Sequence, residues 1–525
     1  MDAYSICCTS PAARHTSKIY QDLWSTRPHT RVGFEQDKFL RKFATMGSSE
    51  QRWRADLTSK PHIAVIGAGL AGLRCADVLI QNGFKVTIIE ARNRIGGRLH
   101  QEVLPNGHLA DVGPNWIHGT DDNPMLDLAK QTNTVVGDWD STSCVFTESG
   151  ELLSLKDGEK YSTIVWDIVQ DAFKHSNSNS QDINSKESLH DFFVQRVAEK
   201  VPDTEADHER KRSLIMQISE MWGAFIGSPI YRQKNLFCSG TYKKILDEIA
   251  KPALQGAEIK YQTKVDRISY RTNPEEKAKV RTESGQTLEF DEVVVTAPLG
   301  WLKRNLDAFE PALPARMTKA IGSIGYGCLE KVYINFPKAY WLGSKDDDRK
   351  AEGFVQWLSP KYVSDTNPKR WNQEVVELAS LGPEVSHPTL LFYTYGEQSQ
   401  FITGELSKIS DPQKKDEFLL NFFKPYYSLL PHYAESSPDC QPSGFMATDW
   451  LNDELAGFGS YSNFQVGLEE GDTDIRTMRE GMPDHGLWLA GEHTAPFVGL
   501  GTATGAYWSG EAVGKRIAEA YGRSK

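Results

Sequence analysis

The sequence predicts an α/β protein in which a Rossmann-like nucleotide-binding domain, with a doubly wound parallel sheet, is interrupted by an inserted α+β domain. Two glycine-rich segments support this prediction. "PHIAVIGAG", from residue 61, opens a strand–turn–helix–strand unit, and "GLWLAGEHT" with the helix-like "TGAYWSGEAVGKRIAEAY" follows between residues 486 and 521. Both segments have the strand–turn–helix pattern of a nucleotide-binding domain, but they lie far apart in the chain. We therefore expect them to form one discontinuous domain.

The first of these segments has the periodicity of a β-α-β unit. A buried strand is predicted over Ile63–Ile66, and a helix over Leu70–Asn82 that Gly83 closes. The apolar string "KVTIIEA" then supplies a second strand. A unit of this length is typical of the start of a doubly wound sheet.

Three glycines in "GAGLAG" match the G-x-G-x-x-G spacing of dinucleotide-binding turns. Gly67 allows the tight turn, Gly69 lets a pyrophosphate approach the backbone, and Gly72 lets the helix pack on the strand. Leu70 and Ala71 begin the helix, whose N-terminal N–H groups attract phosphate. These residues predict a bound dinucleotide, with NAD and FAD both open.

The residues after the second strand extend this site. Glu90 follows Gly72 by 18 positions, where a carboxylate can accept hydrogen bonds from ribose hydroxyls. The string "EARNRIGGRLH" then adds Arg92, a glycine pair that ends at Gly97, and Arg98. A second glycine turn that carries arginines suits a further contact with a pyrophosphate.

This string, together with "GAGLAG" and "LAGEHT", resembles the flavin-containing amine oxidase family, which includes polyamine oxidases, monoamine oxidases and lysine-specific histone demethylases. The resemblance runs from about residue 62 to residue 520 and is closest in motif to polyamine or spermine oxidases. It implies FAD as the cofactor. The positions that match the family's cofactor-binding segments are Gly67, Gly69, Leu70, Ala71, Gly72, Glu90, Ala91, Arg92, Gly97, Arg98, Pro114, Asn115, Trp116, Val265, Glu492, Thr502 and Ala503.

Four further positions match residues that face the flavin or the substrate in the family. Lys331, in the predicted strand "GYGCLEKVYINFP", matches a lysine that holds a water against flavin N5. Tyr461 and Trp450 match two aromatic rings that hold an amine by their π-faces, and His118 in "VGPNWIHG" matches a substrate-contacting histidine. Taken alone, the strand pattern predicts that Lys331 leaves the apolar face and points to solvent. The resemblance implies the flavin edge instead.

Ser460 stands where monoamine oxidases carry a cysteine that is covalently bonded to FAD. The resemblance therefore implies non-covalent FAD. The reaction that it implies is hydride transfer to flavin N5 from the carbon next to an amine nitrogen. The imine product is hydrolysed to an aldehyde and an amine, and O2 is reduced to H2O2.

Polyamines or other primary and secondary amines are the expected substrates. Two alternatives stay open: a family member that oxidises an amino acid or a biosynthetic amine, and a flavoprotein that binds a ligand with little turnover. An amino-acid oxidase needs an arginine for the substrate carboxylate, and the sequence does not place one.

The chain divides, on this interpretation, into six segments. Residues 1–59 are expected to be a disordered tail. The FAD-binding domain takes residues 60–125, 236–325 and 461–525, and the substrate domain takes a helical part, 126–235, and a part with the lysine and the aromatic residues, 326–460.

Composition restricts the partners and the compartment. The 525 residues are enough for two or three domains, and the net charge of −11 argues against a nucleic-acid partner. No apolar run is long enough to predict a membrane span. Seven scattered cysteines without a C-x-x-C spacing predict free thiols, no metal site and a cytoplasmic location. Organelle targeting by residues 1–59 and the oligomeric state stay open.

Overall fold

The computed structural model describes residues 60–137, 144–179, 183–184, 187–223, 235–344, 349–465, 468, 470–496 and 499–523. All of these residues belong to one compact unit. The expected disordered tail, residues 1–59, lies outside the described residues. Among the described helices, none combines the length and the apolar character that a membrane crossing requires.

A five-stranded parallel sheet forms the centre of the nucleotide-binding domain, in the order β21–β12–β1–β2–β8. Its strands are β1 (His62–Ile66), β2 (Lys85–Ile89), β8 (Glu258–Lys260), β12 (Glu292–Val295) and β21 (Leu487–Leu489). Three distant parts of the chain therefore meet in one sheet. This confirms the predicted fold class of a discontinuous, Rossmann-like domain with an insertion.

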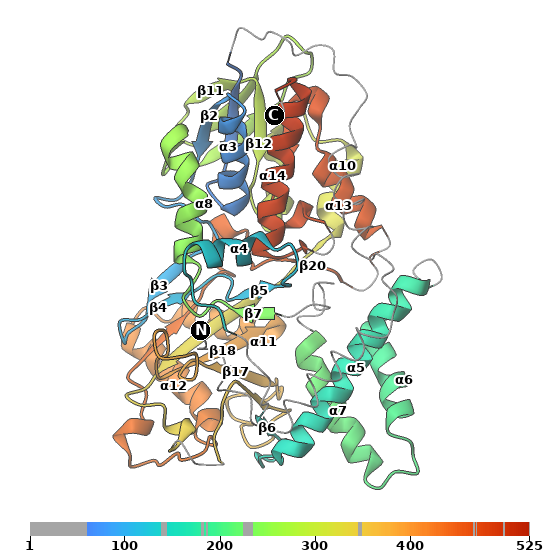
Figure 1. Ribbon diagram of the computed structural model, residues 1–525, viewed down its shortest axis with the longest axis vertical. Coiled ribbons are helices and arrows are strands. Elements are labelled where there is room, and N and C mark those ends of the chain that lie inside the picture. Colours follow the sequence, from blue (N-terminus) through green and yellow to red (C-terminus); the bar gives the residue numbers. More distant parts are fainter. Residues whose placement is uncertain are drawn as a thin grey trace, which may run out of the picture. The chain divides into compact units, whose positions relative to one another are not determined.

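Helices cover one face of this sheet. They are α3 (Leu70–Gln81), α4 (Pro124–Gln131), α8 (Lys243–Gly256) and α14 (Ala503–Ala520). The blue α3 and the red α14 lie side by side in Figure 1. Their approach requires a glycine, because a Cβ at Gly510 would lie 2.1 Å from the carbonyl oxygen of Ala71.

The other face of the sheet packs on smaller elements of the same domain. A four-stranded sheet contains β9 (Val265–Ser269), β10 (Ala278–Thr282), β11 (Thr287–Phe290) and β13 (Phe309–Glu310). The helices on this side are α9 (Leu299–Arg304), α10 (Ala315–Ser323) and α13 (Gly471–Glu480).

The inserted domain is built on a six-stranded sheet in the order β19–β15–β18–β17–β16–β6. Its strands are β6 (Cys144–Phe146), β15 (Leu329–Asn335), β16 (Phe354–Trp357), β17 (Gln373–Glu377), β18 (Thr389–Tyr395) and β19 (Gly444–Ala447). Helices α11 (Gly396–Lys408) and α12 (Pro412–Tyr427) pack on it, and α5 (Leu155–Asn179), α6 (Leu189–Lys200) and α7 (His208–Gly223) form a separate helical group with its own core.

Short two-stranded ribbons connect the two domains. They pair β3 (Gln101–Val103) with β4 (Leu109–Asp111), β5 (Trp116–His118) with β7 (Asn235–Phe237), and β14 (Gly325–Tyr326) with β20 (Ser462–Asn463).

The structure places two elements differently from the predicted segments. Met125, Leu126 and Ala129 of α4 are buried in the core of the nucleotide-binding domain, although the helical part of the substrate domain was predicted to begin at residue 126. Strand β6 lies within the residues that were predicted to be helical, but it pairs with β16 at the edge of the six-stranded sheet. Apolar periodicity shows that a segment is buried, but it does not show which core buries it.

Candidate active site

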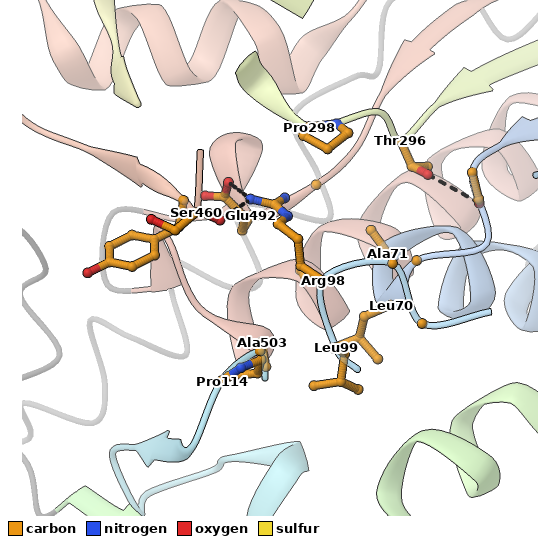
Figure 2. A pocket seen from close by; sticks show the side chains of 18 of the residues that line it. Leu70, Ala71, Arg98, Leu99, Pro114, Thr296, Pro298, Ser460, Glu492 and Ala503 are labelled. Carbon is orange, nitrogen blue, oxygen red and sulfur yellow. Dashed lines mark hydrogen bonds and ion pairs between the residues drawn. The ribbon is translucent and has the colours of Figure 1, made fainter. Parts of the chain in front are cut away.

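One cavity runs from the glycine turn of the nucleotide-binding domain to Lys331 of the inserted domain. With the exception of Gly72, all predicted cofactor-binding residues line it, and so do the four predicted catalytic residues. Figure 2 shows part of this lining, with Arg98 and Glu492 pointing toward each other. Residues from all the predicted cofactor segments therefore meet at one site.

Two helix N-termini line the cavity. Helix α3 begins after Gly69 and has no side-chain cap, and its first residues, Leu70 and Ala71, line the cavity. Helix α14 begins after Thr502, whose hydroxyl accepts the N–H of Gly505 at 2.9 Å, and Ala503 lines the cavity. The partial positive charge at each helix end favours a negatively charged group of a ligand there.

The three glycines of the turn differ in their backbone geometry and surroundings. Gly67 has a φ of +105°, which favours glycine. A Cβ at Gly69 would have no other atom within 4 Å, so the backbone there is open to a ligand. A Cβ at Gly72 would lie 2.1 Å from the carbonyl oxygen of Gly67. Gly72 therefore packs the helix on the turn instead of lining the cavity.

Glu90 is fixed in place by backbone donors at the end of β2. Its carboxylate accepts the N–H of Ala68 at 2.6 Å and the N–H of Arg92 at 2.7 Å. A carboxylate has about four acceptor positions, so Glu90 retains capacity for ribose hydroxyls. The guanidinium of Arg92 forms an ion pair with Asp453 at 2.6 Å, and its place near a pyrophosphate stays a prediction.

A second, more buried ion pair joins Arg98 to Glu492 at 2.9 Å. Arg98 also donates to the carbonyl oxygen of Ser460 at 2.8 Å and to the hydroxyl of Tyr326 at 3.2 Å. Burial alone would lower the pKa of Arg98, but Tyr326 and Glu492 raise it overall. Arg98 is therefore a permanent cation in the middle of the cavity wall.

Lys331 lies at the other end of the cavity and is only 3% exposed. Its ammonium donates to the carbonyl oxygens of Asp111, at 3.0 Å, and Gly113. Burial lowers the pKa of Lys331 far below its usual range, and the Asp111 and Glu330 carboxylates oppose this effect. The solvent-facing interpretation is wrong, because the strand is covered on both faces.

Aromatic side chains surround this end of the cavity. Trp450 donates its indole N–H to the carbonyl oxygen of Val112 at 3.0 Å, and burial raises the pKa of Tyr461 to about 12. Trp116 donates to the hydroxyl of Tyr393 at 3.2 Å. The aromatic walls thus come from four separate parts of the chain. That Trp450 and Tyr461 together hold an amine stays a prediction.

Asn115 and His118 support this region from β5 and the residues before it. The side-chain oxygen of Asn115 accepts the hydroxyl of Tyr393 at 2.8 Å. His118 lies 3.2 Å from the side chain of Asn235, and burial lowers its pKa to about 4. A histidine with this pKa is neutral at pH 7 and can contact an amine without adding a positive charge.

Several residues that line the cavity were not predicted from the sequence. Thr296 and Pro298 line it after β12, and Thr296 donates to the carbonyl oxygen of Ile66 at 2.8 Å. They could have been found, because "VVVTAP" places them at the carboxyl end of a buried strand, where parallel sheets bind ligands. Tyr393 has no comparable signal, since its position depends on strand pairing.

The residues fit an extended dinucleotide. An open glycine backbone, two helix N-termini, an acidic residue at the end of β2 and a half-buried arginine all line the cavity. These are the groups that bind phosphates and ribose in doubly wound folds.

Several known proteins are similar to this chain in sequence or in fold. "Probable polyamine oxidase 4" of Arabidopsis thaliana is 27% identical over 471 residues, which cover 86% of each chain. The "Corticosteroid-binding protein" of Candida albicans is 24% identical over 86% of this chain and 95% of its own. A solved structure of a putrescine oxidase mutant has a TM-score of 0.61 at 16% identity and covers 89% of this chain and 99% of its own.

Two family models match the chain. The model described as pyridine nucleotide-disulphide oxidoreductase matches residues 27–106. The model described as flavin containing amine oxidoreductase matches residues 70–518, which is most of the sequence. The chain therefore belongs to the family of flavin-containing amine oxidoreductases.

Proposed function

We propose that this flavin-dependent amine oxidoreductase binds FAD non-covalently and oxidises a polyamine or a related primary or secondary amine beside Lys331. The observation that carries the proposal is the single cavity that joins the nucleotide site to the buried lysine. The names of the polyamine oxidase and putrescine oxidase relatives support an aliphatic amine as the substrate.

The non-covalent attachment is inferred from the residue beside Tyr461. Ser460 accepts the N–H of Leu329 at 3.0 Å and donates to the carbonyl oxygen of Gly327 at 3.1 Å, so its hydroxyl is used within the protein. No cysteine is among the described residues that line the cavity. Denaturation followed by filtration should release all the flavin, and flavin retained on the polypeptide would contradict the proposal.

When bound, the flavin supplies the acceptor for the hydride that leaves the carbon next to the amine nitrogen. The protein's own residues bind and orient the amine. Trp450 and Tyr461 line the cavity, and we propose that their aromatic rings bind the ammonium or amine. Arg98 contributes a fixed positive charge that favours developing negative charge in the cavity.

Lys331 controls a proton at the reacting end. Because burial lowers its pKa, the ammonium can release a proton far more readily than an exposed lysine. The carbonyl oxygens of Asp111 and Gly113 fix the nitrogen atom in the cavity wall. We propose that Lys331 exchanges this proton with water or with the amine during turnover.

The test is a peroxide assay on purified protein with spermine, spermidine, putrescine, their acetylated forms, an aromatic monoamine and a set of amino acids. The proposal predicts H2O2 and an aldehyde from at least one aliphatic di- or polyamine. Turnover of amino acids alone would favour the alternative substrate class.

A ligand-binding protein with little turnover is the second candidate. The relative named as a corticosteroid-binding protein favours it, because it covers nearly the same length of chain. In that case no amine would yield peroxide, and a corticosteroid would perturb the flavin absorption of the same preparation.

A further inference from the structure

A closed ring of hydrogen bonds connects Lys331 with Trp450 at the inner end of the cavity. The Lys331 ammonium donates to the carbonyl oxygens of Asp111 and Gly113, and the Trp450 indole donates to that of Val112, the residue between them. Both side chains therefore rest on one three-residue segment.

Glu330 closes the ring from the opposite face of β15. Its carboxylate accepts the N–H of Leu451 at 2.8 Å and the hydroxyl of Thr448. The Thr448 hydroxyl in turn accepts the backbone N–H of Lys331 at 2.8 Å, and the Thr448 N–H donates to the carbonyl oxygen of Lys331 at 2.9 Å. Trp450 thus lies in a turn that Glu330 holds on both sides.

A glutamate is not expected at position 330 if the side chain only fills the core. Its side chain is 2% exposed and shares a strand face with Val332 and Ile334, which pack in an apolar core. Burial of a carboxylate costs free energy that only well-made hydrogen bonds offset. The two groups that donate to the Glu330 carboxylate belong to Thr448 and Leu451, on either side of Trp450 in the turn.

We propose that Glu330 is a positioning residue that fixes the Trp450 ring relative to Lys331, and so sets the geometry in which an amine is held for oxidation. The inference deepens the proposed function and rests on it for its effect on the reaction. Glu330 does not line the cavity. It acts through the turn Thr448–Leu451.

The direct test measures hydrogen exchange of the Trp450 indole N–H by NMR in the flavin-loaded protein, with the signal assigned through W450F. E330A should speed this exchange by about tenfold or more, because the turn loses the hydrogen bonds that Glu330 accepts from Thr448 and Leu451. E330Q should restore most of the protection, since its side-chain oxygen can still accept the N–H of Leu451.

Glu377 provides a matched control in the same sheet. It is buried and accepts the N–H groups of Gly353 at 3.2 Å and Ala379 at 2.9 Å, but it does not contact the turn of Trp450. E377A should reduce the melting temperature and leave the Trp450 exchange rate unchanged. Equal exchange in E330A, E377A and wild type would overturn the proposal.

A double-mutant cycle then tests the connection to the reaction. E330A should slow anaerobic reduction of the flavin by a good amine substrate by about 10- to 100-fold, as misplaced reacting groups do. In a W450A background the same change should have little further effect, because the two residues act as one unit. Multiplicative effects would overturn the proposal.

Two additional outcomes separate the possible failures. If E330A proves unstable, T448V removes one connection of the same ring and should give a smaller change in both measurements. If no amine reduces the wild-type flavin, the proposed function fails, while the indole exchange still decides whether Glu330 fixes Trp450.

Discussion

The two ends of the cavity are built in different ways. At the nucleotide end, backbone groups form the surface: the turn at Gly69, the N-terminus of α3, and the donors that fix Glu90. At the lysine end, side chains form the surface, and they bind to the backbone of a neighbouring segment, as Lys331 and Trp450 do.

This difference has a functional consequence. The binding surface of a glycine turn is its backbone, so changing that surface changes the local fold. The nucleotide end therefore suits a cofactor whose chemical identity stays constant. Side chains brought from several segments can be substituted one at a time, so the lysine end can be adapted to a substrate. Changes at the first end should therefore affect folding and flavin content, and changes at the second should affect turnover.

The largest effect is expected from G72A at the nucleotide end. Its Cβ would lie 2.1 Å from the carbonyl oxygen of Gly67, which is a backbone atom that cannot move away cheaply. We expect a loss of about 3 kcal/mol in unfolding free energy and poor flavin loading, measured by denaturant titration and absorbance.

G69A is the control for that variant. Its Cβ would meet no other atom within 4 Å, so the flavin-free protein should be as stable as wild type while its flavin affinity falls. Equal stability of G69A and G72A would contradict the assignment of the two glycines.

K331M tests the lysine end. The variant removes the buried ammonium and leaves the carbonyl oxygens of Asp111 and Gly113 without this donor. We expect turnover to fall by about a hundredfold while the flavin content stays at the wild-type level. Unchanged turnover would remove Lys331 from the reaction, and lost flavin would show that it supports the cofactor instead.

Acid sensitivity should come in part from His493, which is fully buried behind Glu492. Burial lowers its pKa from 6.5 to about 4. The folded protein resists protonation that the unfolded chain accepts, so the stability present above pH 6.5 is lost as the pH falls toward 4.

Between pH 7 and pH 5 this histidine should account for about 2 kcal/mol. H493Q should reduce the difference in unfolding free energy between the two pH values by that amount. The same difference in the variant and the wild type would show that other groups control the acid transition.

The smallest effect is expected from D453N, which breaks the ion pair with Arg92. Both side chains are about one-fifth exposed, so the pair should contribute about 1 kcal/mol or less. Asparagine still accepts the N–H groups of Leu455 and Ala456, so the variant isolates the charge. Raised salt should lower the unfolding free energy of the wild type by a similar amount. A loss of unfolding free energy well above 1 kcal/mol in D453N would show that the pair closes the cavity.

The same contrast explains what the sequence could predict. The nucleotide end depends on local spacing, and the positions of Gly67, Gly69 and Glu90 follow from one β-α-β unit. The family match confirms the resemblance that these motifs indicated. The ion pair of Arg92 with Asp453 was not predictable, because the two residues are 361 positions apart.

At the lysine end, alternation along β15 correctly removed Lys331 from the face of Val332 and Ile334. It could not show what covers the other face, since that depends on Asp111 and Gly113 from the nucleotide-binding domain. Tyr393 was missed for the same reason: its place opposite Lys331 is set by the pairing of β15 with β18.

Anaerobic mixing of the flavin-loaded protein with a set of aliphatic polyamines tests the central claim most directly. If the cavity holds the flavin at one end and an amine beside Lys331 at the other, at least one polyamine will bleach the yellow flavin band without oxygen. If none bleaches it, while a chemical reductant does, the proposed amine site at Lys331 is wrong.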